Sequence, residues 1–384
     1  MLAACGSSAA IKTAGAPAGG TAADRAVTLP APQSPTAQVC RPAPLAERAA
    51  RTLVVGLPDT LTPHDPLAIL VPALHVGGVL LTARNVRSAD QVRALTRGLR
   101  TASRSPLLLT IDEEGGRVSS LLPVLGPTPS ARQQGLQGLQ GAVPTQQRAQ
   151  ALAASLRGLG LTSDLAPVAD TDSGPAGGAI GDRSYAGDPT AAGADALAAA
   201  RGLAKGGVVP AVKHFPGLGR AVGDTHLTRP VVQADLARLQ LTDLRPFTAT
   251  VRAGAPLVMM SHAEYTALGD ALPASMSPAA YRLLRSTGFT GVAMTDSIGM
   301  GAVNTRFDYP EAAVRALAAG ADAVLATDGR QTARMRDAIV AAVHSGQLPE
   351  GRLDEAAARM ARLGGADPLP LTCRDAVLPS LTRP

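Results

Sequence analysis

The sequence lacks several features that would place it in common functional classes. It has no tryptophan and only three lysines, and its more numerous arginines are scattered, so the net charge of +6 forms no basic stripe. No apolar run approaches the roughly 20 residues of a membrane span. The chain also has no G-x-S-x-G elbow, no C-x-x-C zinc pair and no G-K-S/T phosphate loop. These absences argue against a nucleic-acid partner, a serine-hydrolase elbow, a zinc site built on paired cysteines and a phosphate-binding loop.

The composition is that of a globular chain. Its 384 residues are 46% hydrophobic, which is enough to build a sizeable core. A chain of this length can hold one large α/β barrel or two ordinary domains.

The first 40 residues differ from the rest. The opening MLAACGSSAA resembles a bacterial lipoprotein cleavage box with Cys5 as the lipidated residue. Only four residues precede Cys5, so the signal peptide itself is missing, and either the start codon is assigned too late or the match is chance. The following residues have the Ala/Gly/Ser/Thr/Pro composition of a tether. We therefore expect a disordered tether over 1–40, a folded domain over 41–384, and an extracytoplasmic lipoprotein anchored to the cell membrane.

The two remaining cysteines flank the expected folded domain. If the chain is exported, Cys40 and Cys373 can form a disulfide. The alternative is a pair of free thiols, and the sequence leaves both open.

Short apolar runs alternate with Ala/Leu/Arg-rich helical segments from about residue 45. Such runs, separated by helices, indicate parallel strands buried on both faces, and eight of them fit a TIM-like (β/α)8 barrel. A doubly wound sheet is the alternative, but no Gly-rich dinucleotide fingerprint follows the first run. The Gln/Gly-rich segment 133–147 is expected to be a loop before a helix at 148–158. The eight runs are 52–58, 76–82, 106–112, 161–170, 208–216, 256–263, 291–297 and 322–328.

Polar side chains stand at the carboxyl ends of these predicted strands. In an α/β barrel this end carries the active site. Any one of the aspartates could instead cap a helix, which is the interpretation we favour for Asp328. Together they predict a site. The strand-end residues are Asp112, Asp170, Lys213, His214, His262, Asp296 and Asp328.

Two loops combine acids with an arginine. In IDEEGGRVSSL, three acids precede two glycines that would let backbone approach a ligand, and Arg117 is placed to neutralise the acids. This stretch could be a metal site, a clamp for sugar hydroxyls or a solvated turn. In GDRSYAGDP, Arg183 lies between Asp182 and Asp188 and could form a structural ion pair with either.

Two of the six histidines lie in VKHFPGLGRAVGDTH. Lys213 and His214 are candidates to hold a substrate. In the loop, Asp224 can orient His226, which can then donate a proton to a leaving group and take one from water. Asp296 could attack a sugar carbon and form a covalent intermediate. Retaining glycosidases divide the work in this way, normally with two carboxylates.

Four ordered motifs over about residues 50–330 resemble glycoside hydrolase family 3, in particular its short bacterial β-N-acetylglucosaminidase branch. DEEGGRV is similar to D-x-E-G-G-R-V, IGDRSY to I-G-D-R-S-F, KHFPGLGRAVGDTH to K-H-F-P-G-H-G-D-T-x-x-D-S-H, and VAMTDSIGMGAV to V-x-x-S/T-D-x-x-x-M-x-A. The resemblance implies that Asp296 is the nucleophile, His226 the acid/base and Asp224 its partner. The residues that it places at sugar-binding or supporting positions are Asp112, Arg117, Arg183, Lys213 and His214.

The chain departs from the family pattern in its catalytic loop. Leu218 replaces the second loop histidine, and Arg220-Ala221 replaces Asp-Thr, so the hydrogen bonding of the loop must differ. The chain also ends before the α/β sandwich domain of larger members, which implies that the barrel and its loops form the whole site. With four Phe, four Tyr and no Trp, a short pocket for one terminal sugar is expected rather than a long polysaccharide cleft.

The resemblance implies an exo-acting, retaining β-N-acetylglucosaminidase that acts on GlcNAc-containing cell-wall fragments, including muropeptides. It implies no metal or organic cofactor and no nucleic-acid partner, and contact with a membrane only through the anchor at Cys5. One alternative is a phosphorylase, because a histidine acid/base does not repel phosphate as a glutamate would. The other is a surface protein that binds muropeptides or a partner without turnover, which the altered loop would favour.

Overall fold

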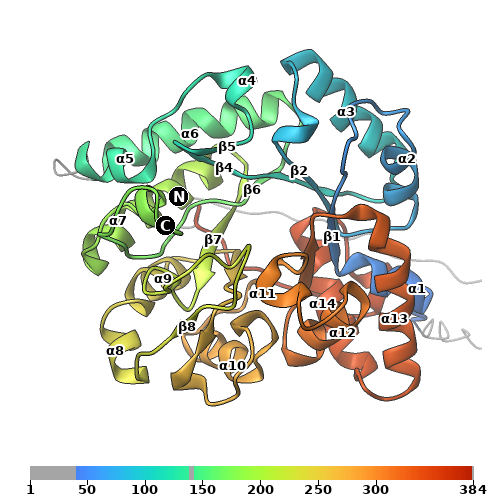
Figure 1. The fold of residues 1–384 in the computed structure, drawn as a ribbon. Coiled ribbons are helices and arrows are strands. Elements are labelled where there is room, and N and C mark those ends of the chain that lie inside the picture. The colour runs from blue at the N-terminus through green and yellow to red at the C-terminus, as the bar shows by residue number, and fades with distance from the viewer. Residues whose placement is uncertain (1–39, 138–141, 383–384) are drawn as a thin grey trace, which may run out of the picture. The chain divides into compact units, whose positions relative to one another are not determined.

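The computed structural model describes residues 40–137 and 142–382 (Figure 1). Eight parallel strands close into a barrel in the order β1-β12-β11-β9-β7-β6-β3-β2, which confirms the predicted (β/α)8 architecture. Each predicted run contains one barrel strand. The strands are β1 (Leu53–Gly56), β2 (Gly78–Leu81), β3 (Leu108–Ile111), β6 (Ser163–Asp164), β7 (Val209–Phe215), β9 (Leu257–Met260), β11 (Val292–Ser297) and β12 (Ala323–Ala326).

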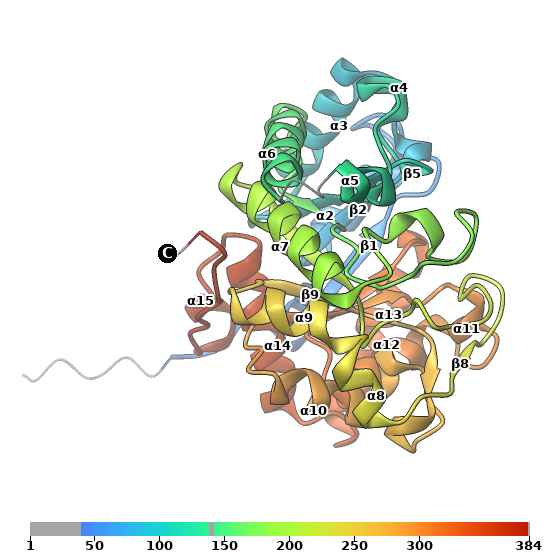
Figure 2. The same ribbon diagram turned by 90° about the vertical axis from the view of Figure 1, so that its left-hand side faces the viewer.

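Helices surround the ring of strands, as the views in Figures 1 and 2 show. Their bounds are α1 (Leu45–Arg51), α2 (Pro66–Ala73), α3 (Ala89–Ala102), α4 (Leu122–Leu125), α5 (Ala131–Gln137), α6 (Val143–Gly158), α7 (Pro189–Lys205), α8 (Leu236–Leu241), α9 (Leu244–Arg252), α10 (Pro278–Ser286), α11 (Gly301–Asn304), α12 (Tyr309–Ala319), α13 (Thr332–His344), α14 (Glu350–Leu363) and α15 (Leu369–Thr372). Two small sheets lie outside the barrel: antiparallel β4 (Glu113–Gly115) with β5 (Val118–Ser119), and parallel β8 (Val231–Val232) with β10 (Glu264–Tyr265).

Most of the barrel strands are apolar on both faces because each face packs against a different core; β6 (Ser163–Asp164) is an exception. Successive side chains of a strand point to opposite sides. In β1, Val54 belongs to the cluster that fills the barrel, whereas Leu53 and Val55 belong to the cluster between the strands and the helices. Residues of both kinds are fully buried, which explains why the runs are continuous rather than alternating.

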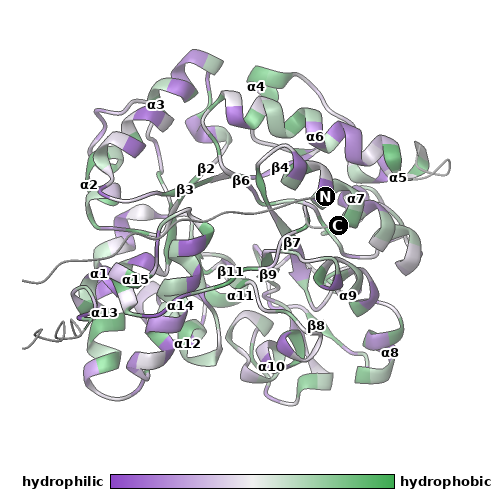
Figure 3. Cartoon of the chain, turned by 180° about the vertical axis from the view of Figure 1, so that it is seen from behind, coloured by the Kyte–Doolittle hydropathy of each residue, from purple (hydrophilic) through white to green (hydrophobic). Residues whose placement is uncertain are grey.

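The helix α3 illustrates why the intervening segments are amphipathic. Its N-cap, Ser88, accepts a hydrogen bond from the Gln91 N–H. Its buried residues Val92, Leu95 and Leu99 are spaced three or four apart and so share one face. Figure 3 shows both hydrophilic and hydrophobic residues along this helix. No helix within residues 40–137 and 142–382 is long and apolar enough to cross a membrane.

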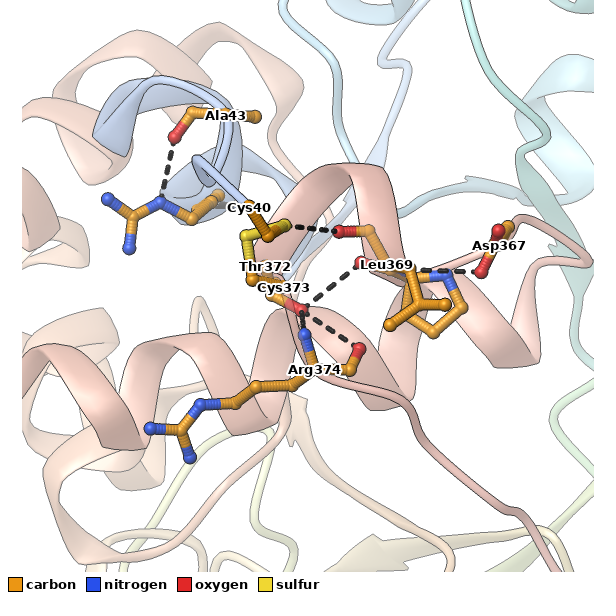
Figure 4. The surroundings of a disulfide bond; sticks show 9 residues. Cys40, Ala43, Asp367, Leu369, Thr372, Cys373 and Arg374 are labelled. Atoms are coloured by element: carbon orange, nitrogen blue, oxygen red, sulfur yellow. Dashed lines mark hydrogen bonds between the residues drawn. A yellow bond between two sulfur atoms is a disulfide. The ribbon is translucent and has the colours of Figure 1, made fainter. Parts of the chain in front are cut away.

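Of the two possibilities that the sequence left open, the structure shows the disulfide between Cys40 and Cys373 (Figure 4). It joins the segment before α1 to the residue that follows α15, and the two Cα atoms lie 5.8 Å apart. The proposed lipid site at Cys5 and the tether up to residue 39 lie outside the described residues.

The predicted loop at 133–147 is wrong at both ends. The helix α5 extends to Gln137, and α6 begins at Val143 with Pro144 in its first turn. Proline is tolerated there because the first N–H groups of a helix have no partner within the helix. Residues 138–141 lie outside the described part.

Candidate active site

A cavity of about 300 Å³ lies at the carboxyl ends of the barrel strands. Its volume is at the small end of the range for ligand pockets, about 300–1,000 Å³. Leu80, Leu165, Met259 and Leu325 give it an apolar floor. Every residue to which the family resemblance gives a role, except Arg117, lines it; the strand-end residues Asp170, His262 and Asp328 do not. The residues with such a role that line the cavity are Asp112, Arg183, Lys213, His214, Asp224, His226 and Asp296.

One wall of the cavity is an ion network centred on Lys213. The ammonium Nζ lies 2.6 Å from Asp112 Oδ1 and 2.6 Å from Glu114 Oε1. The guanidinium of Arg183 contacts both oxygens of Glu114, with Nε at 2.8 Å from Oε2 and Nη2 at 2.8 Å from Oε1. Such bidentate pairing fixes the orientation of both groups.

Glu114 and Lys213 stay charged within this network. Burial raises the pKa of Glu114, but the charges of Arg183 and Lys213 outweigh it and hold that pKa well below its usual range. Burial lowers the pKa of Lys213, but Asp112 and Glu114 outweigh it and raise that pKa above its usual value. The wall therefore offers preorganised charged donors and acceptors, which suit sugar hydroxyl groups.

The predicted partners of the two arginines were wrong. Arg117 does not neutralise the acids; it donates to Asp182 Oδ1 at 2.8 Å and to the carbonyls of Gly178 and Ile180. Arg183 pairs with Glu114 instead of a neighbouring aspartate, while Asp188 caps α7 by accepting the N–H groups of residues 190 and 191. Arg117 therefore braces the loop that carries Arg183 and lies outside the cavity.

The nucleophile candidate Asp296 stands at the end of β11. Its Oδ1 accepts the N–H of Ser297 at 2.7 Å. Burial raises its pKa, but the neighbouring His262 and His214, the Ser297 N–H and the charge of Lys213 together outweigh it, so the pKa lies below its usual value. A carboxylate that is ionised at neutral pH can act as a nucleophile.

The strand-end His262 supports the backbone next to Asp296. Its Nε2 lies 2.9 Å from the carbonyl oxygen of Ser297, which can only accept, so Nε2 carries a proton. Its Nδ1 lies 2.7 Å from Ser275 Oγ, and burial lowers the pKa of the ring. We conclude that a neutral His262 donates to Ser297 and accepts from Ser275.

The Asp-x-His pair of the loop forms as predicted. Asp224 Oδ1 accepts both the backbone N–H and the ring Nδ1–H of His226, at 2.9 and 2.8 Å. Burial raises the pKa of Asp224, but these contacts with His226 outweigh it and lower the pKa. With Nδ1 committed to Asp224, Nε2 is the ring atom available for proton transfer. The His226 side chain is 65% exposed, so bulk water can reach it.

The loop is held at both ends. The carbonyls of Thr225 and His226 accept the N–H groups of Ala302 and Gly301, each at 3.0 Å, at the start of α11. At the other end, Arg220 pairs with Asp243 through an Nε–Oδ2 contact of 2.7 Å. Arg220, which departs from the family pattern, therefore provides one of the anchors of the loop.

Glu114 is the site residue that sequence reasoning missed. It was noted only as one of three consecutive acids. The signal was the alternation of an extended chain, which places Asp112 and Glu114 on the same side and Glu113 on the other. Glu113 indeed turns away from the cavity and accepts the N–H of Leu121 at 2.8 Å.

The side chains around the cavity determine the chemistry that they can support. Within residues 40–137 and 142–382, no three His, Cys, Asp or Glu side chains converge as metal ligands would. The cavity combines an ionised carboxylate, an imidazole suited to proton transfer and a charged wall that can bind hydroxyl groups. This combination can support acid/base-assisted displacement at a sugar carbon.

Comparison with known proteins identifies the family to which the chain belongs. Residues 49–363 match the model for the glycosyl hydrolase family 3 N-terminal domain. The chain is 36% identical over 352 residues to beta-hexosaminidase LpqI of Mycobacterium tuberculosis, covering 89% of each chain. The structure of M. tuberculosis LpqI matches with a TM-score of 0.78, 33% identity, and coverage of 85% of this chain and 98% of that one.

A second solved structure is a family 3 β-N-acetylglucosaminidase from Paenibacillus sp.. It matches with a TM-score of 0.79 and 32% identity, covering 84% of this chain and 62% of that chain. The family match spans most of the sequence and the barrel fold agrees with it. The chain therefore belongs to glycoside hydrolase family 3.

Proposed function

We propose that the protein is an exo-acting, retaining β-N-acetylglucosaminidase. The observation that carries the proposal is the convergence on one small cavity of an ionised Asp296 and the Asp224–His226 pair. The beta-hexosaminidase and β-N-acetylglucosaminidase names of the relatives agree with it.

The residues divide the reaction between two steps. In the first, His226 protonates the glycosidic oxygen while Asp296 attacks the anomeric carbon and forms a covalent glycosyl–enzyme intermediate. In the second, His226 takes a proton from water, which displaces Asp296 and releases the sugar. Asp112, Arg183, Lys213 and His214 bind hydroxyl groups of the terminal sugar throughout.

The proposed substrates are GlcNAc-containing cell-wall fragments, including muropeptides. The small cavity suits one terminal sugar, and the charged wall suits its hydroxyl groups. This wall needs no aromatic stacking platform, which fits a chain without tryptophan.

The test is release of 4-nitrophenol from its β-N-acetylglucosaminide by the purified protein, with Asp296→Ala and His226→Ala as comparisons. We expect turnover that is lost in Asp296→Ala. Addition of phosphate should leave the released sugar unphosphorylated; a sugar 1-phosphate product would identify a phosphorylase instead. No turnover by the folded, unmutated protein would contradict the proposal and favour a binding protein.

We also propose that the protein is exported and anchored through Cys5. The disulfide between Cys40 and Cys373 supports export, because such bonds persist in oxidising compartments. Incorporation of a labelled fatty acid into the full-length protein, and its loss in Cys5→Ala, would test the anchor. An unlabelled full-length protein recovered in the cytoplasm would contradict it.

A further inference from the structure

One buried carboxylate, Asp170, contacts two parts of the site at once. Its side chain is 0% exposed. Its Oδ2 lies 2.7 Å from His214 Nδ1, and its Oδ1 accepts the N–H of Leu218 at 2.6 Å. The backbone N–H of His214 adds contacts of 3.2 and 3.3 Å to the same carboxylate. The sequence placed Asp170 at a strand end, but the proposed reaction gives it no role.

The contact with Asp170 decides which ring nitrogen of His214 carries the proton. A carboxylate only accepts hydrogen bonds, so Nδ1 must donate to it. The other nitrogen, Nε2, lies 3.3 Å from Nη2 of Arg183, a group that only donates. His214 therefore presents Nε2 as an acceptor toward the cavity, and its orientation and tautomer both depend on Asp170.

The contact with Leu218 reaches the catalytic loop. Leu218 is nearly fully buried, lines the cavity and stands at the start of the segment that leads to Asp224 and His226. The hydrogen bond from its N–H to Asp170 holds the beginning of this segment next to His214, which contacts the same carboxylate. The carboxylate of Asp170 therefore binds both the proposed sugar-binding side chain of His214 and the backbone at Leu218, where the segment that carries His226 begins.

We infer that Asp170 is a positioning residue that fixes the tautomer of His214 and anchors the loop carrying His226. Its effect on catalysis rests on the proposed function, whereas its effect on the tautomer and on the loop does not. The two can therefore be tested separately.

The first test measures the unmutated protein and uses a variant only for assignment. In protein labelled with ¹⁵N-histidine, and with His214 assigned by its loss in His214→Asn, the ring shifts of His214 should show the proton on Nδ1. A proton on Nε2 in the unmutated protein would overturn the inference.

The second test uses Asp170→Asn, which separates the two contacts. The amide oxygen can still accept from Leu218, but the amide NH₂ would face Nδ1 of His214, which must then accept and carry its proton on Nε2. That proton would point at Arg183. We expect the ¹⁵N shifts to switch tautomer and KM to rise by roughly tenfold, the size of one misdirected buried hydrogen bond, with a smaller change in kcat.

The third test uses Asp170→Ala, which removes both contacts. We expect kcat to fall further than in Asp170→Asn, and trypsin to cut faster after Arg220, which is exposed and followed by alanine. The matched control is Asp322→Asn, which perturbs an equally buried carboxylate just before β12, at the opposite end of the barrel.

Two results would overturn the inference. One is an Asp170→Asn variant that keeps the Nδ1 proton. The other is an Asp170→Ala variant whose kinetics and trypsin cleavage match those of Asp322→Asn, since Asp170 would then act only through general stability. If the unmutated protein lacks activity, the tautomer and cleavage results still decide the structural part.

Discussion

The ammonium nitrogen of Lys213 lies 2.6 Å from Oε1 of Glu114. Both side chains are nearly inaccessible to water, at 2% and 3% exposed. Glu114 also pairs with the guanidinium of Arg183, so one carboxylate contacts two buried cations. The geometry of the sugar-binding wall therefore depends on a residue that needs no contact with substrate.

Replacing Glu114 with glutamine should damage binding more than chemistry. The amide keeps the shape but removes the negative charge that pairs with both Arg183 and Lys213. We expect kcat/KM to fall by about 100-fold, on the order of 3 kcal/mol, mainly through KM. Steady-state kinetics with 4-nitrophenyl β-N-acetylglucosaminide would measure it.

The control for that variant is Glu311→Gln on the surface of α12. Glu311 also pairs with an arginine, Arg315, but both side chains are nearly half exposed. Exposed pairs contribute little, so this change should leave kinetics and stability almost unaltered. Equal kinetic losses in the two variants would contradict the role given to Glu114.

Replacing Asp224 with asparagine should slow the step that needs a proton. The amide can no longer hold the Nδ1 proton of His226 as the carboxylate does, so the acid/base loses orientation. We expect kcat to fall by roughly tenfold to a hundredfold. The loss of kcat/KM, which reports the step in which the leaving group departs, should be larger for substrates with basic leaving groups than for 4-nitrophenol, which needs little protonation. An equal loss of kcat/KM across leaving groups would show that Asp224 acts on the fold rather than on protonation of the leaving group.

The barrel could be predicted from the sequence because its physical cause is local. A strand buried on both faces must be a short apolar run, and eight such runs alternate with amphipathic segments. The residues at the strand ends then share one face by geometry alone. Even the modest expectation for Asp328 is met, since it accepts the Arg330 N–H and begins a 3₁₀ turn.

The ion-pair partners could not be predicted in the same way. Arg183 has an aspartate beside it in sequence, yet it pairs with Glu114, 69 positions away. Neighbouring strand ends meet at the mouth of the barrel, and burial there makes the distant carboxylate the stronger partner. The adjacent Asp182 forms an ion pair with Arg117 instead. Adjacency in sequence is a poor guide where tertiary structure brings charges together.

Replacing Asp164 with asparagine should stabilise the protein. This fully buried side chain accepts the Glu113 N–H through Oδ1 at 3.0 Å, while Oδ2 has no hydrogen-bond partner among the described residues. Burial raises the pKa of Asp164 well above its usual value, so at neutral pH folding must either bury a charge or take up a proton. Asparagine keeps the acceptor and removes the charge. We expect a gain of about 1 kcal/mol in the free energy of unfolding at pH 7.

The pH dependence of this gain follows from the direction of the shift. Because the folded-state pKa of Asp164 is raised, the carboxyl becomes protonated as the pH falls, and the penalty disappears. Urea unfolding should show the advantage of Asp164→Asn shrinking from pH 7 towards pH 4. The control Asp164→Ala, which leaves the Glu113 N–H without an acceptor, should be destabilising. A destabilised Asp164→Asn would mean that Oδ2 has a partner outside the protein.

Replacing Asp322 with asparagine should destabilise the protein, which is the opposite of the effect expected for Asp164→Asn. The pH dependence of the two effects should also have opposite physical origins, because the pKa of Asp322 is lowered and that of Asp164 is raised. Its buried carboxylate accepts from Arg285 at 2.6 Å, Arg352 at 2.5 Å and Arg359 at 2.9 Å. Removing a charge that compensates buried or partly buried cations costs about 3–5 kcal/mol. We expect a loss of this size in the free energy of unfolding at pH 7, measured with urea.

At acid pH, the difference in the free energy of unfolding between the unmutated protein and Asp322→Asn should disappear. Burial raises the pKa of Asp322, but Arg352 and Arg285 outweigh it, so the folded-state pKa lies below the ordinary value of 3.8. A depressed carboxyl pKa contributes stability that is complete above the unfolded-state pKa and is lost as the pH falls through the folded-state pKa. The gap between the unmutated protein and Asp322→Asn should therefore be constant from pH 7 to about pH 5 and should narrow below about pH 4. A gap that stays constant down to pH 3, with the unmutated protein still folded, would show that the loss comes from packing rather than from the charge of Asp322.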